Sequence, residues 1–194
     1  QSIEDLALYR TIPNMTVLHP SDDLSATELT QQLLDYHESS YTRTARNKTP
    51  RIYTEKTVKS LQIGKGSILS EGDSVAIIAI GVMVHKALMA AENLRQEGIN
   101  VKVIDMHTIK PIDTELLDDL ANNVQGIVTV EDHSIIGGLG SAVSEYLSEN
   151  NPTRVVKIGV DDRFGESGGS EELLELVGLT IESIESAVRS IVEL

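Results

Sequence analysis

Short apolar runs alternate with helical stretches over the second half of the chain. Val75 to Ile80 is an uninterrupted apolar run, which is typical of a strand buried on both faces. The stretch from Met83 to Gln96 is predicted to be a helix, and Gly98 closes it. The alternation continues, with strands predicted at 101–104, 126–130 and 155–158 and helices at 114–122, 141–148, 170–177 and 182–192. The pattern predicts an α/β fold with a mostly parallel sheet and helices on both faces.

The first third of the chain has a shorter pattern. Residues 14–20 predict a short strand, and residues 51–54 predict a second one. Between them, Ser25 and Glu28 have the spacing of a capping box, which indicates the start of a helix. Residues 42–50 are polar and are predicted to form a loop.

Glycines and charged residues interrupt both patterns between the two parts of the chain. We therefore predict a partial α/β module at residues 1–60, a linker at 61–72 and an α/β domain at 73–194. A strand, a helix and a short strand cannot close a core alone. The first module is therefore expected to need packing partners.

Composition narrows the class of protein. No apolar run approaches the roughly 18 consecutive residues of a membrane span, and the first residues lack the basic and apolar regions of a secretion signal. The net charge of −14 disfavours binding to a phosphate backbone, which requires Lys and Arg. The chain has no cysteine, which excludes disulfides and favours a reducing compartment. We expect a cytoplasmic protein that binds neither membrane nor nucleic acid.

Three motifs carry a family resemblance. They are MHTIKPID (Met106 to Asp113), VTVEDHSIIGGLGSAVSEY (Val128 to Tyr146) and GVDDRFGESG (Gly159 to Gly168). In this order and spacing they resemble the C-terminal domain of transketolase, most closely the C-terminal subunit of a split transketolase. The opening QSIEDLALYRTIPNMTVLHPSD is similar to the later part of the family's pyrimidine-binding domain. The resemblance therefore implies that residues 1–60 are the C-terminal remnant of that domain.

The resemblance implies an enzyme that transfers a two-carbon ketol unit between sugar phosphates with thiamine diphosphate and Mg²⁺. Family members carry a Gly-Pro-Thr-His-type sequence just before the position of Gln1, and the glutamate that activates the cofactor lies earlier still. We therefore expect no catalytic, cofactor-binding or metal-binding residue in this chain. The expected partners are a second copy, bound through the C-terminal domain, and an N-terminal subunit or domain that carries the diphosphate site.

Other assignments remain open. Deoxyxylulose-phosphate synthase and the β subunit of 2-oxo-acid dehydrogenases are related thiamine-diphosphate enzymes, although SIEDLALYRTIPNM and EDHSIIGGLG favour transketolase. A non-catalytic assembly or regulatory subunit is a different class. The presence of the family's cofactor motifs upstream of Gln1 would favour the enzyme, and their absence would favour the non-catalytic subunit.

The glycine turn from Gly137 to Gly140 has two interpretations. Its backbone N–H groups and the following helix could hold a phosphate, or its glycines could allow close packing of strand and helix. The turn lacks the third glycine of the GxGxxG pattern and has no lysine, so packing is favoured.

Glu131, Asp132 and His133 follow the strand at 126–130, and we expect them in a loop. They have the chemistry of an acid/base unit or a metal site, but adjacent residues in an extended chain point to opposite faces, which favours an interface. Ile135 and Ile136 would be an aggregation hazard unless covered. The predicted dimer interface comprises His107, Lys110, Glu131, Asp132, His133, Ile135, Ile136, Gly137 and Gly138.

Transketolases usually carry an arginine just after the last strand of the pyrimidine domain, where it binds the sugar phosphate. Aligning Pro50 with the proline before that strand places Thr57 at this position, beside Lys56. Lysine binds phosphate as a point charge but lacks the bidentate fork of arginine. Lys56 and Thr57 are therefore the predicted substrate-phosphate residues.

Overall fold

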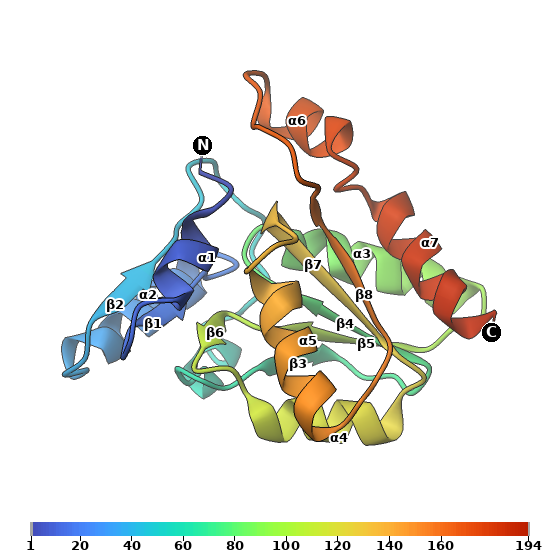
Figure 1. The fold of residues 1–194 in the computed structure, drawn as a ribbon, viewed down its shortest axis with the longest axis horizontal. Coiled ribbons are helices and arrows are strands. Elements are labelled where there is room, and N and C mark those ends of the chain that lie inside the picture. Colours follow the sequence, from blue (N-terminus) through green and yellow to red (C-terminus); the bar gives the residue numbers. More distant parts are fainter. Residues whose placement is uncertain (1, 194) are drawn as a thin grey trace.

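The computed structural model, which describes residues 2–193, is a mixed α/β fold whose larger sheet has five strands in the order β3-β5-β4-β7-β8 (Figure 1). β4, β5, β7 and β8 are parallel, and β3 runs antiparallel to β5 at one edge. The strands are β3 (Ser67–Ser70), β4 (Val75–Ala79), β5 (Val101–Asp105), β7 (Ile127–Ser134) and β8 (Val155–Val160). The predicted fold class is confirmed.

Helices cover both faces of this sheet because its central strand is apolar on both sides. Alternate residues of β4 pack with α3 (Met83–Gln96) and α7 (Ile181–Val192) on one face. The residues between them pack with α4 (Thr114–Asn123) and α5 (Leu139–Asn150) on the other. Each fully buried Ile or Val side chain contributes about 1.5–3 kcal/mol. The remaining helix of this part is α6 (Ser170–Leu176).

A second sheet joins the two parts of the chain. It has the order β2-β1-β6, in which β1 (Thr16–Leu18) is parallel to β2 (Ser40–Thr42) and antiparallel to β6 (Thr108–Lys110). Since β6 follows β5, the first module borrows a strand from the second part of the chain. Helices α1 (Asp5–Arg10) and α2 (Asp23–Leu34) flank this sheet.

The strand predicted at residues 51–54 is not formed. The N–H groups of Ile52 and Tyr53 donate to the carboxylate of Asp22 at 2.8 and 2.9 Å, so this segment lies against the N-terminus of α2 instead of a strand. The strand that pairs with β1 is β2, which the sequence pattern did not reveal. The same Asp22 is the N-cap of α2, and Ser25 is the third helical residue of the capping box rather than its cap.

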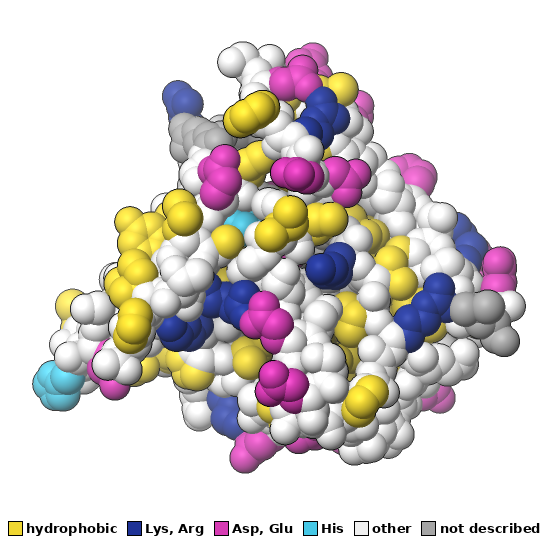
Figure 2. All heavy atoms as spheres, in the orientation of Figure 1, with side chains coloured by type: hydrophobic (Ala, Val, Ile, Leu, Met, Phe, Trp, Pro, Cys, Tyr) yellow, Lys and Arg dark blue, Asp and Glu magenta, His cyan; other side chains and the backbone are white. Residues whose placement is uncertain are grey.

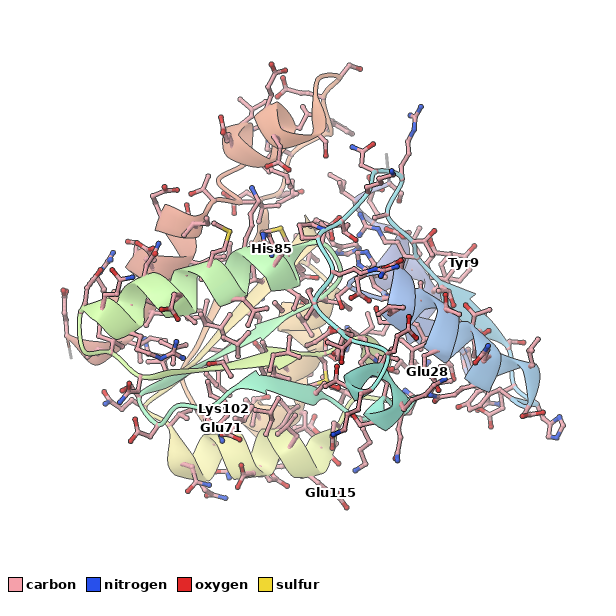
Figure 3. All side chains as sticks on the ribbon, turned by 180° about the vertical axis from the view of Figure 1, so that it is seen from behind. Tyr9, Glu28, Glu71, His85, Lys102 and Glu115 are labelled. Carbon is pink, nitrogen blue, oxygen red and sulfur yellow. The ribbon has the colours of Figure 1, made fainter. Side chains whose placement is uncertain are left out.

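Two further elements differ from the prediction. β7 continues to Ser134, so Glu131 to His133 belong to the strand and not to a loop. The predicted linker contains the edge strand β3, and the 3₁₀ helix η1 (Thr57–Ser60) directly precedes the linker. The side chains of Glu71, which follows β3, and Lys102 of β5 meet at 3.4 Å (Figure 3). The domain division at 61–72 stays a prediction.

Within residues 2–193, no helix is long and apolar enough to cross a membrane.

Candidate functional site

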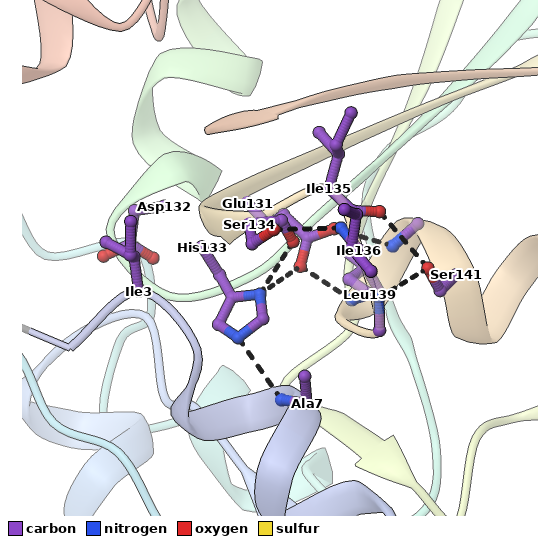
Figure 4. A network of polar contacts seen from close by, with 12 residues as sticks. Ile3, Ala7, Glu131, Asp132, His133, Ser134, Ile135, Ile136, Leu139 and Ser141 are labelled. Carbon is purple, nitrogen blue, oxygen red and sulfur yellow. Dashed lines mark hydrogen bonds and ion pairs between the residues drawn. The ribbon is translucent and has the colours of Figure 1, made fainter. Parts of the chain in front are cut away.

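The carboxylate of Glu131 occupies the N-terminus of α5. Its two oxygens accept the N–H groups of Leu139 and Gly140 at 2.7 and 2.8 Å (Figure 4). Burial raises the pKa of Glu131 to about 7, against the lowering effect of these two hydrogen bonds. The N–H groups that could have bound a phosphate are thus already used within the chain, which supports the packing interpretation of the glycine turn.

The glycines of the turn allow this close approach. A Cβ at Gly138 would overlap the carboxylate of Glu131, and one at Gly140 would lie 2.7 Å from the hydroxyl of Thr129. Gly137 has a φ of +79°, and a Cβ there would lie 2.7 Å from the Cβ of Ala7. Side chains at these positions would separate β7, α5 and α1.

His133 connects β7 to α1. Its Nδ1 lies 2.8 Å from the carbonyl oxygen of Ser134, and its Nε2 lies 3.3 Å from the backbone N of Ala7. A carbonyl only accepts and a backbone N–H only donates, so the pair of contacts assigns the proton to Nδ1 of a neutral ring. Both ring nitrogens are therefore occupied in a structural role.

Asp132 holds the residue that follows β2. Its Oδ2 and its carbonyl oxygen each accept from Nη2 of Arg43 at 3.0 Å. Its other carboxylate oxygen lies 3.7 Å from Nδ1 of the buried His19. Burial lowers the pKa of His19 to about 4, which the charge of Asp132 opposes, so the ring is neutral near pH 7. On its other side, Arg43 lies 3.7 Å from Asp5, which also accepts from Tyr41.

Asp105, the last residue of β5, also contacts the first part of the chain. It is fully buried and accepts the hydroxyls of Ser21 at 2.7 Å and Tyr53 at 2.9 Å. Burial raises its pKa to about 7. Asp105 and the Glu131–His133 segment lie at the carboxyl ends of the parallel strands β5 and β7. This is the edge at which open α/β sheets usually bind ligands.

His107 and Lys110 lie beside this edge. His107 is buried, its Nδ1 is 3.0 Å from the hydroxyl of Thr108, and burial lowers its pKa to about 4. The ammonium group of Lys110 donates to the carbonyl oxygens of Arg10 and Ile12 at 2.9 and 2.6 Å. Lys110 thus satisfies carbonyls at the C-terminus of α1.

Comparison with known proteins decides the family. Residues 64–184 match the family described as the transketolase C-terminal domain. The chain belongs to the transketolase family. It is 42% identical over 185 residues to a putative transketolase C-terminal section from Methanocaldococcus jannaschii, which covers 95% of this chain and 58% of the relative. It is 41% identical over 192 residues to a 6-deoxy-6-sulfo-D-fructose transketolase subunit from a Clostridium species, covering 99% of this chain and 59% of that protein.

Solved transketolase structures are also similar to this chain. A split-gene transketolase, described as an inactive β4 tetramer, superposes with a TM-score of 0.95 at 44% identity over 100% of this chain and 63% of the other. A transketolase mutant from Pichia stipitis has a TM-score of 0.77 at 22% identity over 27% of its length, which shows the fold alone. The chain thus spans about three-fifths of the curated transketolase sections that it matches.

Most residues predicted for the dimer interface are buried or bound to other parts of the same chain, and only the isoleucine side chains are not. His107, Glu131, His133 and Gly138 are buried within the chain itself. The carbonyl of Gly137 accepts from Arg10 at 2.8 Å, Lys110 contacts α1, and Asp132 binds Arg43. Ile135 is half-buried, and Ile136 is 60% exposed.

Exposed apolar residues on α1 and just after it were not expected from the sequence. Leu8, Tyr9 and Ile12 are exposed, and Figure 2 shows hydrophobic side chains gathered over α1 and beside the glycine turn. Leu8 and Tyr9 lie on α1 and Ile12 follows the helix, so no helical repeat in the sequence singles them out.

The predicted phosphate residues do not follow a strand. Lys56 precedes the 3₁₀ helix η1, and the hydroxyl of Thr57 accepts from the backbone N of Thr54 at 2.9 Å. Since β2 is the strand parallel to β1, the residues just after the strand are Arg43 and Arg46. Arg43 is bound to Asp132, whereas Arg46 is exposed.

The segment that carries Arg46 borders a groove. The groove has a volume of about 480 Å³ and lies between residues 44–49 and the N-terminus of α2. It is lined by Ser21, Asp22 and Ala26 on one side and by Ala45, Asn47 and Lys48 on the other. The groove therefore has carboxylates on one wall and a cationic segment on the opposite wall.

Proposed function

We propose that this chain is the C-terminal part of a transketolase, which transfers a two-carbon ketol unit from a ketose phosphate to an aldose phosphate with thiamine diphosphate and Mg²⁺. The observation that carries the proposal is the match, over 95–100% of this chain, to proteins named as transketolase sections or split transketolases. A deoxyxylulose-phosphate synthase from Aquifex aeolicus is 39% identical over 186 residues, which is below the 42% and 41% identity to the transketolase section and subunit. The transketolase sections therefore support the assignment better.

The described residues do not fit the cofactor. Within residues 2–193, no group of three or more His, Asp or Glu side chains is placed to hold a metal ion. The helix N-terminus at the glycine turn, the candidate for a diphosphate, is filled by Glu131. We assign the cofactor site to an N-terminal subunit or domain, and to this chain the roles of assembly and support.

In place of Lys56 and Thr57, we assign contact with the substrate phosphate to Arg46. This arginine follows the last strand of the pyrimidine-binding module, where the resemblance expects a phosphate-binding arginine. Guanidinium binds phosphate bidentately, which lysine and threonine cannot do. Arg46 is exposed and makes no hydrogen bond or ion pair with another described residue, so its guanidinium is available.

Self-association is assigned to the surface formed by Leu8, Tyr9, Ile12 and Ile136, together with Ile135 and Gly137. We call this surface the α1–turn patch. Ile135, Ile136 and Gly137 belong to the predicted interface, and Leu8, Tyr9 and Ile12 add exposed apolar side chains from α1 and the turn after it. The similar split-gene transketolase is described as a β4 tetramer, which supports contact between copies of such chains.

Reconstitution tests the proposed function. The chain, combined with the chain or domain that carries the diphosphate site, should transfer a ketol unit from a ketose phosphate to an aldose phosphate. The chain alone should show neither transfer nor heat of binding in a calorimetric titration with thiamine diphosphate and Mg²⁺. Binding by the chain alone would refute the division of roles, and a reconstituted complex without transfer would favour the non-catalytic subunit.

A further inference from the structure

We propose that Asp132 and Asp105 are positioning residues for the substrate phosphate. They fix the two ends of the segment from residue 44 to residue 50, which we call the arginine loop because it carries Arg46. The inference rests on the proposed function, since it takes Arg46 as the phosphate contact. It adds a role for the larger sheet, whose strands hold both aspartates although the chain does not hold the cofactor.

The first anchor precedes the arginine loop directly. The backbone N of Arg43 donates to the carbonyl oxygen of Leu18 at 2.9 Å, and its guanidinium donates to Asp132. The side chain of Arg43 is only 16% exposed, so this ion pair is poorly screened by solvent. Both the backbone and the side chain of the residue before the loop are therefore fixed, the latter to β7.

The second anchor follows the arginine loop. Arg51 binds Asp23 through two nitrogens, with contacts of 2.6–3.1 Å, and Asp22 accepts the next two backbone N–H groups. The hydroxyl of Tyr53 then reaches the fully buried Asp105 at the end of β5. This end of the loop is therefore held by α2 and by the larger sheet at once.

Between these anchors the arginine loop has no hydrogen bonds of its own with the described chain. Its residues are mostly exposed, and its position depends on its two ends. A guanidinium matches a phosphate only within a narrow range of positions and angles. Fixing the stem reduces the conformational freedom that Arg46 must lose when a phosphate binds.

The location of the anchors supports this role. Asp105 and Asp132 lie at the carboxyl ends of β5 and β7, the edge at which open α/β sheets usually bind a separate ligand. Here that edge is filled by Ser21, Arg43 and Tyr53 from the first module of the same chain. The sheet thus binds the base of the arginine loop in place of a small molecule.

Steady-state kinetics of the complete enzyme test the proposal with a phosphorylated ketose and its unphosphorylated counterpart as donors. Asp132→Asn should raise the KM of the phosphorylated donor by about tenfold, because a charge-assisted bond at the stem is weakened. The kcat with the phosphorylated donor, and both KM and kcat with the unphosphorylated donor, should stay within about twofold of the wild-type values. The matched control Glu97→Gln, which removes an exposed partner of Arg189, should leave both donors unaffected.

A double-mutant cycle separates this inference from the proposed function. In an Arg46→Gln background, Asp132→Asn should change the KM of the phosphorylated donor by less than about twofold, because its effect passes through Arg46. Independent, multiplicative effects would overturn the positioning role while leaving Arg46 in place. If Arg46→Gln alone has no effect, the assignment of Arg46 fails instead, and the positioning role fails with it.

Limited proteolysis gives a readout that does not depend on activity. Asp132→Asn, or the milder Tyr53→Phe, should speed tryptic cleavage after Arg46 and Lys48 by severalfold and leave cleavage after Lys86 and Arg95 of α3 unchanged. An equal increase at all sites, or equal losses for both donors, would show that the aspartate only stabilises the fold and would overturn the proposal. Tyr53→Phe keeps the test valid if Asp132→Asn fails to fold.

Discussion

Nε2 of His133 lies 3.3 Å from the backbone N of Ala7 and accepts a hydrogen bond from it, although 126 residues separate the two in sequence. Replacing His133 by Phe keeps a ring of similar shape but leaves this N–H without a partner. An unsatisfied buried donor costs about 1–3 kcal/mol, so His133→Phe should lower the free energy of unfolding in urea by that amount. Amide exchange of Ala7 should also become faster.

The control for this variant is His85→Phe. His85 lies on α3 (Figure 3) and takes no part in the hydrogen bond between His133 and Ala7, so its replacement should leave the exchange of Ala7 unchanged. If His133→Phe leaves both the stability and the exchange unchanged, the hydrogen bond does not hold α1 to β7.

Gly138→Ala should destabilise the chain strongly. The added Cβ would overlap the carboxylate of Glu131 and force that buried group away from the N–H groups of α5. We expect a loss of about 3 kcal/mol or more in urea unfolding. Gly165→Ala is the control: a Cβ there meets nothing within 4 Å, so the change should stay within about 0.5 kcal/mol. Equal effects at the two positions would contradict the close packing described for the turn.

Ile136→Lys should weaken self-association without unfolding the chain. Ile136 is 60% exposed in the single chain, so its replacement removes little core packing but places a charge in the α1–turn patch. Sedimentation velocity should show a shift from oligomer to monomer at unchanged thermal stability. Phe164→Lys, at another exposed apolar residue outside the patch, should leave the oligomer intact. A wild-type chain that sediments as a monomer at high concentration would refute the assignment.

Asp105 should make stability depend on pH. Burial raises its pKa from 3.8 to about 7, so the folded chain retains a proton that the unfolded chain has released between these values. Asp105 therefore contributes stability below about pH 4 that is lost as the pH rises through about 7. Asp105→Asn stays neutral, and its free energy of unfolding relative to wild type should grow over this range by up to about 4 kcal/mol.

Denaturant unfolding between about pH 4 and 8 measures this difference. Repulsion by the charge of Asp22 adds to the rise of the Asp105 pKa. Asp119→Asn, at an exposed carboxylate, is the control and should follow the wild-type curve. Parallel curves for Asp105→Asn and wild type would show that Asp105 is ionised in the folded chain throughout.

The four parallel strands of the larger sheet were predictable because they obey local rules. The run at β4 is apolar on both faces, and the helix from Met83 to Gln96 was found with its correct ends. β2 escaped detection because Ser40, Tyr41 and Thr42 form a short, mixed stretch whose strand character comes only from pairing with β1. An isolated sequence window does not contain that partner.

The site was less predictable for the same reason. Glu131 and His133 were singled out from the sequence, but their partners, the start of α5 and Ala7, are set by tertiary packing. The placement of the phosphate contact at Lys56 and Thr57 depended on the strand predicted at residues 51–54, which is not formed. Once β2 is known, Arg46 lies in the segment that follows the strand.

The most direct test of the account compares Arg46→Gln with Lys56→Gln in the complete enzyme. Each variant removes one exposed cation, so their effects on folding and net charge are matched. With a phosphorylated ketose donor, Arg46→Gln should raise KM by at least about tenfold, because a bidentate phosphate contact is lost, and Lys56→Gln should change it by less than about twofold. A large rise in KM for Lys56→Gln with no change for Arg46→Gln would contradict the assignment.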